Sequence, residues 1–218
     1  NTAMGYSALD ALTTGNYNSA FGKDALGANT AEHNSAFGWQ ALAANTTGTY
    51  NTAYGAQALE ANTTANNNIA IGYQSLHVNT TGANHIAIGV LALAANTTGS
   101  DNLAIGYSTL EKNTTGIRNV AVGSNALEDN VTHNYNVAIG YDCLREATAS
   151  NNTGVGWEAL KNNTTGQQNV AIGAQSLLTN STGDYNVAVG YRPLYDNTTG
   201  DANTAMGYAA LFENTTGN

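Results

Sequence analysis

The chain consists of a short repeat, and the length of that repeat leaves very few folds open. Aligned on the glycine that ends each N-x-A-x-G segment, here called the strand glycine, successive copies are 17 residues apart ten times and 16 residues apart twice. The thirteen strand glycines are Gly5, Gly22, Gly38, Gly55, Gly72, Gly89, Gly106, Gly123, Gly140, Gly156, Gly173, Gly190 and Gly207. Because the copies follow one another without a spacer, we expect residues 1–218 to form a single repeat array with no internal boundary.

Each copy reads approximately N-x-A-φ-G-x-x-A-L-x-x-N-T-T-G-x-x, where φ is apolar. The segment N-I-A-I-G at 68–72 alternates small and β-branched residues, which is the period of a β-strand. The stretch around Leu is too short for an ordinary helix, and the following N-T-T-G is a turn cluster. Since helical solenoids need about 30 or more residues per repeat, the period fits one strand-turn-strand coil. We therefore predict an all-β fold, a parallel β-solenoid of thirteen coils with equivalent residues stacked in ladders.

The two faces of the predicted strand differ in chemistry, and this difference predicts an interface. Ala and Gly on one face allow close approach inside a narrow coil beside the Leu ladder, which leaves the larger apolar residues facing outward. A continuous exposed apolar stripe normally marks an interface, so we expect copies of the chain to associate, most simply as a homotrimer. The predicted interface residues are Ile71, Ile88, Ile105, Val122, Ile139, Ile172 and Val189. The opposite assignment, with Ile and Val inside and Ala outside, stays open from the sequence.

The iterated N-x-A-I-G strand with a Leu further on resembles the head repeats of trimeric autotransporter adhesins. The longer coil with N-T-T-G is similar to repeats of bacterial and phage tail-fibre-like proteins. The resemblance implies a left-handed parallel β-roll packed as a trimer, which serves as shaft or adhesive head of an extracellular fibre on a cell or virion. Asn1 begins in phase and Asn218 follows a turn, so we also expect end-to-end stacking or a longer parent fibre.

Composition argues against several other classes of protein. The net charge is −9 with only six Lys and Arg residues, so the chain is poorly suited to neutralise the phosphates of a nucleic acid. No apolar run approaches the roughly 18 residues of a membrane span. The single cysteine, Cys143, cannot form an internal disulfide. It replaces Ala in its repeat position, and we expect it to be a small packed residue.

The repeat places no catalytic or metal-ligating constellation in register, so we expect no enzyme activity, metal or cofactor. The four histidines occupy different repeat positions, and His33 and His133 are expected to be solvated loop residues. The most irregular copy contains Arg145, Glu146 and Gly154 and shows no recognisable constellation. A scattered calcium site at Asp101, Asp184 and Asp201, or a polysaccharide-degrading enzyme, is a weaker alternative.

The N-T-T-G segment has two interpretations. It is an N-x-[ST] acceptor for N-linked glycan, and the candidate positions are Asn45, Asn62, Asn79, Asn96, Asn113, Asn130, Asn163, Asn180, Asn197 and Asn214. The structural interpretation is that Asn and Thr bond to the turn backbone, Gly takes a positive φ, and stacked Asn side chains form amide ladders. Its two adjacent Thr columns also suggest ice binding, although neighbouring residues of an extended chain point apart.

Aromatic residues recur directly after the strand glycine, and we call this set the corner aromatic column. Its members are Tyr6, Trp39, Tyr73, Tyr107, Tyr141, Trp157, Tyr191 and Tyr208. They are candidates for stacking on sugar rings or gripping a receptor. The alternative we favour is packing from coil to coil that covers the apolar row, at the edge of the subunit interface if the strand continues through the glycine.

Overall fold

The computed structural model describes residues 1–217, in which there are thirteen three-residue strands and no helix. The chain divides into two compact units, Asn1–Thr115 and Gly116–Asn218, which are described in turn. The single uninterrupted array expected from the sequence remains a prediction.

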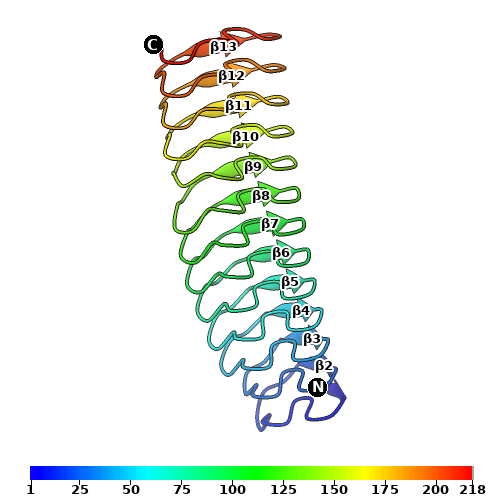
Figure 1. The fold of residues 1–218 in the computed structure, drawn as a ribbon. Helices are drawn as coiled ribbons and strands as arrows, with labels where there is room; N and C mark the ends of the chain where they lie inside the picture. The colour runs from blue at the N-terminus through cyan, green and yellow to red at the C-terminus, as the bar shows by residue number, and fades with distance from the viewer. Residues whose placement is uncertain (218) are drawn as a thin grey trace. The chain divides into compact units, whose positions relative to one another are not determined.

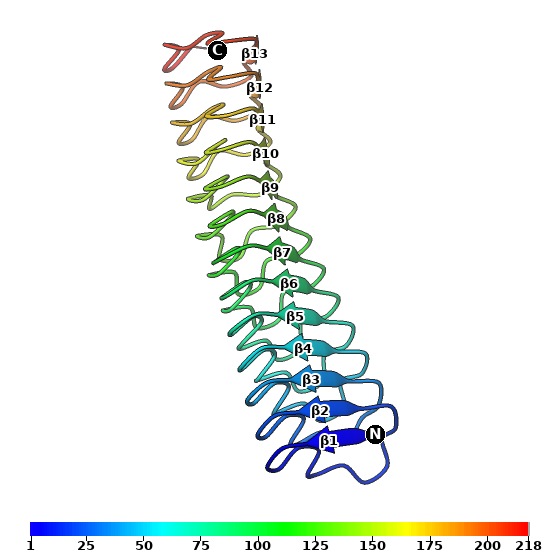
Figure 2. The same ribbon diagram turned by 90° about the vertical axis from the view of Figure 1, so that its right-hand side faces the viewer.

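The first unit contains seven parallel strands paired in chain order, and Figure 1 shows them stacked one coil after another from blue to green. Their bounds are β1 (Thr2–Met4), β2 (Ser19–Phe21), β3 (Ser35–Phe37), β4 (Thr52–Tyr54), β5 (Ile69–Ile71), β6 (Ile86–Ile88) and β7 (Leu103–Ile105). The register is that of the repeat, because Ala70 pairs with Ala87 and Ile71 with Ile88. In Figure 2 the strands of this unit form one row, with loops projecting on both sides of it.

The second unit contains six parallel strands with the same in-register pairing. They are β8 (Val120–Val122), β9 (Val137–Ile139), β10 (Thr153–Val155), β11 (Val170–Ile172), β12 (Val187–Val189) and β13 (Thr204–Met206). Each unit is therefore a parallel β-solenoid with one strand per coil, which confirms the predicted fold class.

The core of each coil is narrow and consists mainly of Ala and Leu. The middle Ala of the strand and the Leu after the strand glycine are both fully buried, as Ala87 and Leu93 illustrate. No Phe, Tyr or Trp belongs to the buried core of the described residues. The prediction that Ala faces inward is confirmed, and the alternative with Ile and Val inside is wrong. Burying one Leu contributes about 1.5–3 kcal/mol, so each coil depends heavily on its contacts with neighbouring coils.

The strand glycine is required by its backbone conformation and by the coil next to it. Gly89 has φ +137°, and a Cβ there would overlap the carbonyl of Gly106. The chain bends at this glycine, so the strand ends at the residue before it. The corner aromatic column therefore belongs to the turn, and the condition under which it would share a face with the apolar row is not met.

Most coils hold three non-glycine residues at positive φ, among them the buried Leu. In the fourth coil of the first unit these are Gln57 (φ 59°), Leu59 (φ 53°) and Asn67 (φ 59°). Their N–H groups donate to the carbonyls of Trp39 at 2.8 Å, Ser75 at 3.0 Å and Thr49 at 3.1 Å, all in adjacent coils. A left-handed residue costs about 1–2 kcal/mol, but Leu burial and a hydrogen bond of about 0.5–1.5 kcal/mol offset that cost.

The Asn that precedes the strand closes the coil from inside. Asn68 is fully buried; its Oδ1 accepts the backbone N–H of His85 at 3.0 Å, and its Nδ2 donates to the carbonyl of Gly82 at 3.1 Å. Equivalent asparagines repeat this arrangement, and we call the set the strand Asn column. Because both its oxygen and its nitrogen are hydrogen-bonded, the buried side chain links strand to loop, and these bonds offset the cost of removing it from water.

Candidate functional site

The outer strand face, formed by the first and third residue of each strand, is an apolar and exposed surface. Ile71 is 37% exposed, Ile139 40% and Ile172 42%. The other predicted interface residues are half-buried, namely Ile88, Ile105, Val122 and Val189. All seven thus point outward as expected, while their role in association remains a prediction.

Residue size is compensated within most strands of this face. In the first unit β1–β4 combine Ser or Thr with a large residue, as in Ser35 and Phe37, whereas β5–β7 combine two aliphatic residues, as in Ile86 and Ile88. Phe21 and Phe37 stack with ring centroids 4.9 Å apart. The twenty-six outward positions of the thirteen described strands include no charged residue.

The corner aromatic column is exposed along both units. Trp39 and Trp157 are each 47% exposed and Tyr107 is 56% exposed. Among the described members of this column, the one contact between two aromatic rings joins Tyr191 and Tyr208, with centroids 5.6 Å apart. Stacking of ring on ring is therefore a local feature of the second unit and does not account for the column in the first.

The asparagines of N-T-T-G form buried amide ladders, which confirms this part of the structural interpretation of the motif. Asn79 is fully buried, and its Nδ2 donates to Oδ1 of Asn62 at 3.1 Å and to the carbonyl of Gly82 at 2.9 Å. The buried positions are Asn45, Asn62, Asn79, Asn96, Asn113, Asn130, Asn163, Asn180 and Asn197, and Asn214 is half-buried. A glycan needs this same nitrogen, so the buried positions of the folded coil leave no accessible acceptor for it.

The loop glycine is required for a reason that the sequence did not reveal. Gly82 is outside the set of positive-φ residues, and a Cβ on it would lie 2.6 Å from Oδ1 of Asn79. The expected positive φ of this glycine is wrong, because Asn84, two residues later, takes it with φ 62°. Glycine is needed here because a Cβ would also overlap the carbonyl of Gly99 in the next coil.

The two Thr columns differ in their hydrogen bonding. Oγ1 of Thr80 donates to the carbonyl of Thr97 at 3.1 Å, and most of this first column repeats the bond. The next column, which includes Thr81 and Thr98, is exposed. Members of the first column such as Thr46 and Thr164 are exposed as well, but their hydroxyl groups donate to backbone carbonyls of the next coil at 3.0 and 2.8 Å. Ice binding therefore gains no support from the first column.

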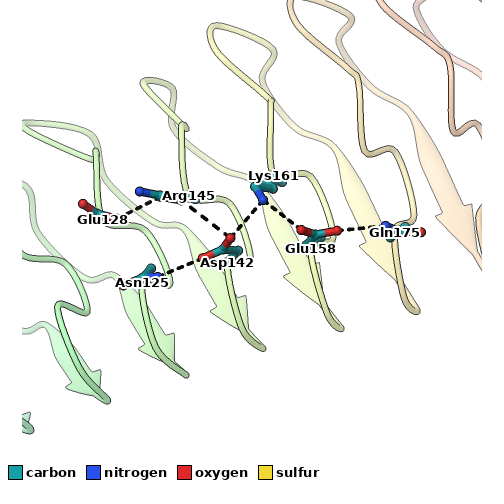
Figure 3. A network of polar contacts seen from close by, with 7 residues as sticks. All are labelled: Asn125, Glu128, Asp142, Arg145, Glu158, Lys161 and Gln175. Atoms are coloured by element: carbon teal, nitrogen blue, oxygen red, sulfur yellow. Dashed lines mark hydrogen bonds and ion pairs between the residues drawn. The ribbon is translucent and has the colours of Figure 1, made fainter.

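A polar network in the second unit was missed from the sequence, and Figure 3 shows it running across neighbouring coils. Nζ of Lys161 lies 2.9 Å from the carboxylate of Asp142 and 2.8 Å from that of Glu158. Arg145 Nε donates to Glu128 at 2.8 Å. Aligning the copies would have revealed it, because Glu128, Arg145 and Lys161 share one repeat position.

The network holds its charges paired. Burial raises the pKa of Asp142, but hydrogen bonds from Asn125 and Lys161 and the nearby cations outweigh it, so the pKa lies below its ordinary value. Hydrogen bonds to Glu158 and Asp142 raise the pKa of Lys161. Each group is thus held in its charged form, which suits a structural link between coils and not proton transfer.

The histidines occupy three kinds of site. His33 stacks between Tyr17 and Tyr50, with centroids 4.8 and 4.9 Å away, so it packs on rings where a solvated side chain was expected. His77 Nδ1 lies 3.3 Å from Glu60. His85 replaces Asn in the strand Asn column and is fully buried.

Cys143 is a buried packing residue, as predicted. A Cβ on Gly154 would lie 2.6 Å from its Sγ, so the larger Cys is accommodated by the missing methyl group of the adjacent coil. Burial raises the pKa of the thiol to about 12. Such a thiol is protonated at neutral pH and is a poor nucleophile or metal ligand.

The search for other sites and for relatives gave the following results. Within residues 1–217 there is no pocket, no cluster of three potential metal ligands, and no helix long and apolar enough to cross a membrane. Asp184 and Asp201 accept backbone N–H groups of the preceding coil at 2.6 and 2.8 Å. No protein-family model, curated protein or solved structure matches the chain.

Proposed function

We propose that the chain is a structural segment of an extracellular fibre, in which copies associate side by side through the outer strand face. The observation that carries this proposal is the uncharged outer strand face described above, in a protein with 10% charged residues and a net charge of −9. A face that only met water would have no reason to exclude charge, whereas the centre of a protein interface does.

Size compensation supports the same proposal. In β3 the first residue, Ser35, is small and the third, Phe37, is large, whereas in β6 the two residues, Ile86 and Ile88, are equal in size. Only close packing against another surface penalises changes in the combined volume of two outward side chains. A second copy of the chain has the same spacing between coils, so each of its coils can pack against one coil of the first copy.

The homotrimer is the arrangement that we propose, because three equal apolar strips around one axis cover one another and close the assembly. The resemblance to trimeric adhesin heads favours the same stoichiometry and a role as shaft or adhesive head. The inter-coil hydrogen bonds and amide ladders suit such a mechanical role.

The test measures mass by sedimentation equilibrium between 1 and 50 μM, roughly the range in which standard interfaces are populated. We expect three times the chain mass of 22.4 kDa. Ile88→Lys should give monomers because it places an unpaired charge in the interface. Thr98→Lys, on the exposed Thr column of the same coil, is the matched control and should leave the mass unchanged.

A wild-type chain that stays monomeric over this range would rule out the proposed association. A dimer would retain the interface but exclude the homotrimer. Circular dichroism of each variant separates loss of association from loss of fold.

A further inference from the structure

The corner aromatic column presents exposed rings to solvent. Both tryptophans of the chain, Trp39 and Trp157, lie in it, and each is 47% exposed. Tyr73 and Tyr107 are 48% and 56% exposed. Large aromatic side chains normally contribute to stability by burial, so a row of exposed rings indicates contact with something outside the coil.

The spacing of the rings in the first unit is regular. Trp39, Tyr73 and Tyr107 occupy every second coil, and the coils between them have Ala56 and Val90 at that position. Adjacent strands are about 4.8 Å apart, so consecutive rings are separated by about 10 Å. Within the described part of the chain these three side chains are 47%, 48% and 56% exposed, which leaves part of each ring accessible to a ligand.

Polar amides accompany the rings. Gln57 and Gln74 directly follow Ala56 and Tyr73 in sequence, and both are half-buried. Gln74 Nε2 donates to Oε1 of Gln57 at 3.0 Å. Since one hydrogen bond uses only part of an amide's capacity, Nε2 of Gln57 and Oε1 of Gln74 can bond to hydroxyl groups beside the rings.

Charge restricts the class of ligand. Lys23 is the one charged residue in the corner position of the described coils, and the chain as a whole carries −9. A polyanion would be repelled by the protein, and a polycation would find no carboxylates in the column. An uncharged ligand fits this surface, and the absence of a pocket among residues 1–217 favours an extended one.

We propose that Trp39, Tyr73 and Tyr107 bind an uncharged, extended β-1,4-linked polysaccharide that lies along the column. Such a chain presents the same face at every second sugar, an interval that matches rings on alternate coils. Its C–H faces would pack on the rings, and its hydroxyl groups would bond to Gln57 and Gln74. This activity goes beyond the fibre role and does not require association of chains, because the glycine bend separates the column from the outer strand face.

The test is affinity electrophoresis in gels containing hydroxyethyl cellulose, a soluble β-1,4-glucan, with parallel gels containing soluble starch or alginate. We expect retardation by hydroxyethyl cellulose alone, because starch is a helical α-linked chain and alginate is anionic. The same polysaccharide should shift the tryptophan emission, since both tryptophans lie in the column.

Variants locate the site. Trp39→Ala and Tyr73→Ala should each weaken binding roughly three- to tenfold, as expected for loss of one stacking ring. Tyr50→Ala is the matched control, because Tyr50 is 59% exposed in the same unit but lies outside the column. Ile88→Lys should retain binding even if it abolishes association.

The proposal is overturned by equal mobility in all gels, by binding that Trp39→Ala and Tyr73→Ala leave unchanged, or by equal loss in Tyr50→Ala. Loss of binding in a folded Ile88→Lys variant would also contradict it, because it would place the polysaccharide at the outer strand face. If only the fibre proposal fails, the protein will be a monomer that still binds hydroxyethyl cellulose.

Discussion

Replacing His85 by Asn should remove part of the pH dependence of unfolding in the first unit. His85 is fully buried in a column where the neighbouring coils have Asn68 and Asn102. Its Nε2 lies 2.7 Å from the carbonyl of Gly99, and its Nδ1 accepts the backbone N–H of Asn102 at 3.3 Å. This hydrogen bonding assigns the neutral Nε2–H tautomer, and a second proton on Nδ1 would face another donor.

Burial lowers the pKa of His85, and the contacts with Gly99 and Asn102 and the charge of Asp101 oppose this shift without cancelling it. The unfolded chain therefore binds a proton, at about pH 6.5, that the folded chain does not. The free energy of unfolding is unaffected by this group above that pH. As the pH falls further, protonation of this group in the unfolded chain lowers the free energy of unfolding by up to about 1.4 kcal/mol per pH unit, until the pKa of the folded state is reached.

In His85→Asn the side chain can reproduce the bonds of Asn68, whose Oδ1 accepts an N–H and whose Nδ2 donates to a loop carbonyl. Between pH 7.5 and 5.5 the wild type should lose more than the variant in urea unfolding, by up to about 1.4 kcal/mol. All other side chains are the same in both proteins, so their contributions cancel in the difference. Identical pH dependence, or an NMR titration of His85 at its ordinary pKa, would refute the reasoning.

Three further substitutions test the packing of the coils. Gly154→Ala should destabilise the second unit by about 1–3 kcal/mol through overpacking, and adding Cys143→Ala should restore the lost stability. A double-mutant cycle without coupling would contradict the packing of Cys143 against Gly154. Gly89→Ala should cost about 3 kcal/mol from backbone strain alone, measured as a fall in Tm; an unchanged Tm would show that the bend tolerates a side chain. Leu93→Ala should lower the free energy of unfolding by about 2–5 kcal/mol. Leu91→Ala is the control and should cost clearly less, because Leu91 is half-buried at a similar φ of 60°. Equal losses in chemical denaturation would exclude the Leu ladder as the core.

The repeat predicted most of the fold because period and face chemistry are properties of the sequence alone. Alternation around Ala87 and the invariant Leu column led to a strand-turn-strand coil with Ala and Leu inside, and the structure differs in having one strand per coil. The size of Cys143 in an Ala position was enough to predict a packed residue. These features depend on which side chains fit a narrow interior, and little else competes with that constraint.

Other features could not be predicted because they arise between coils. Leu59 has φ 53°, although single-residue preferences disfavour that region for Leu. Its N–H reaches the carbonyl of Ser75 in the next coil at 3.0 Å, and this bond is invisible until the coils are stacked. Burial of Asn79 also depends on the neighbouring coils, because N-T-T-G considered alone is compatible with both an amide ladder and a glycan acceptor.

The coils must also be kept in order, since nearly identical repeats can pair equally well after a slip of one whole coil. The ladders of Ala, Leu and Asn do not distinguish one coil from the next. The network in the second unit does, because a slip would separate Lys161 from Asp142 and Arg145 from Glu128. Asp142 is 2% exposed, and a buried charge without its partner costs several kcal/mol. The irregular residues that disturb the repeat thus specify the register that the regular ones leave undetermined.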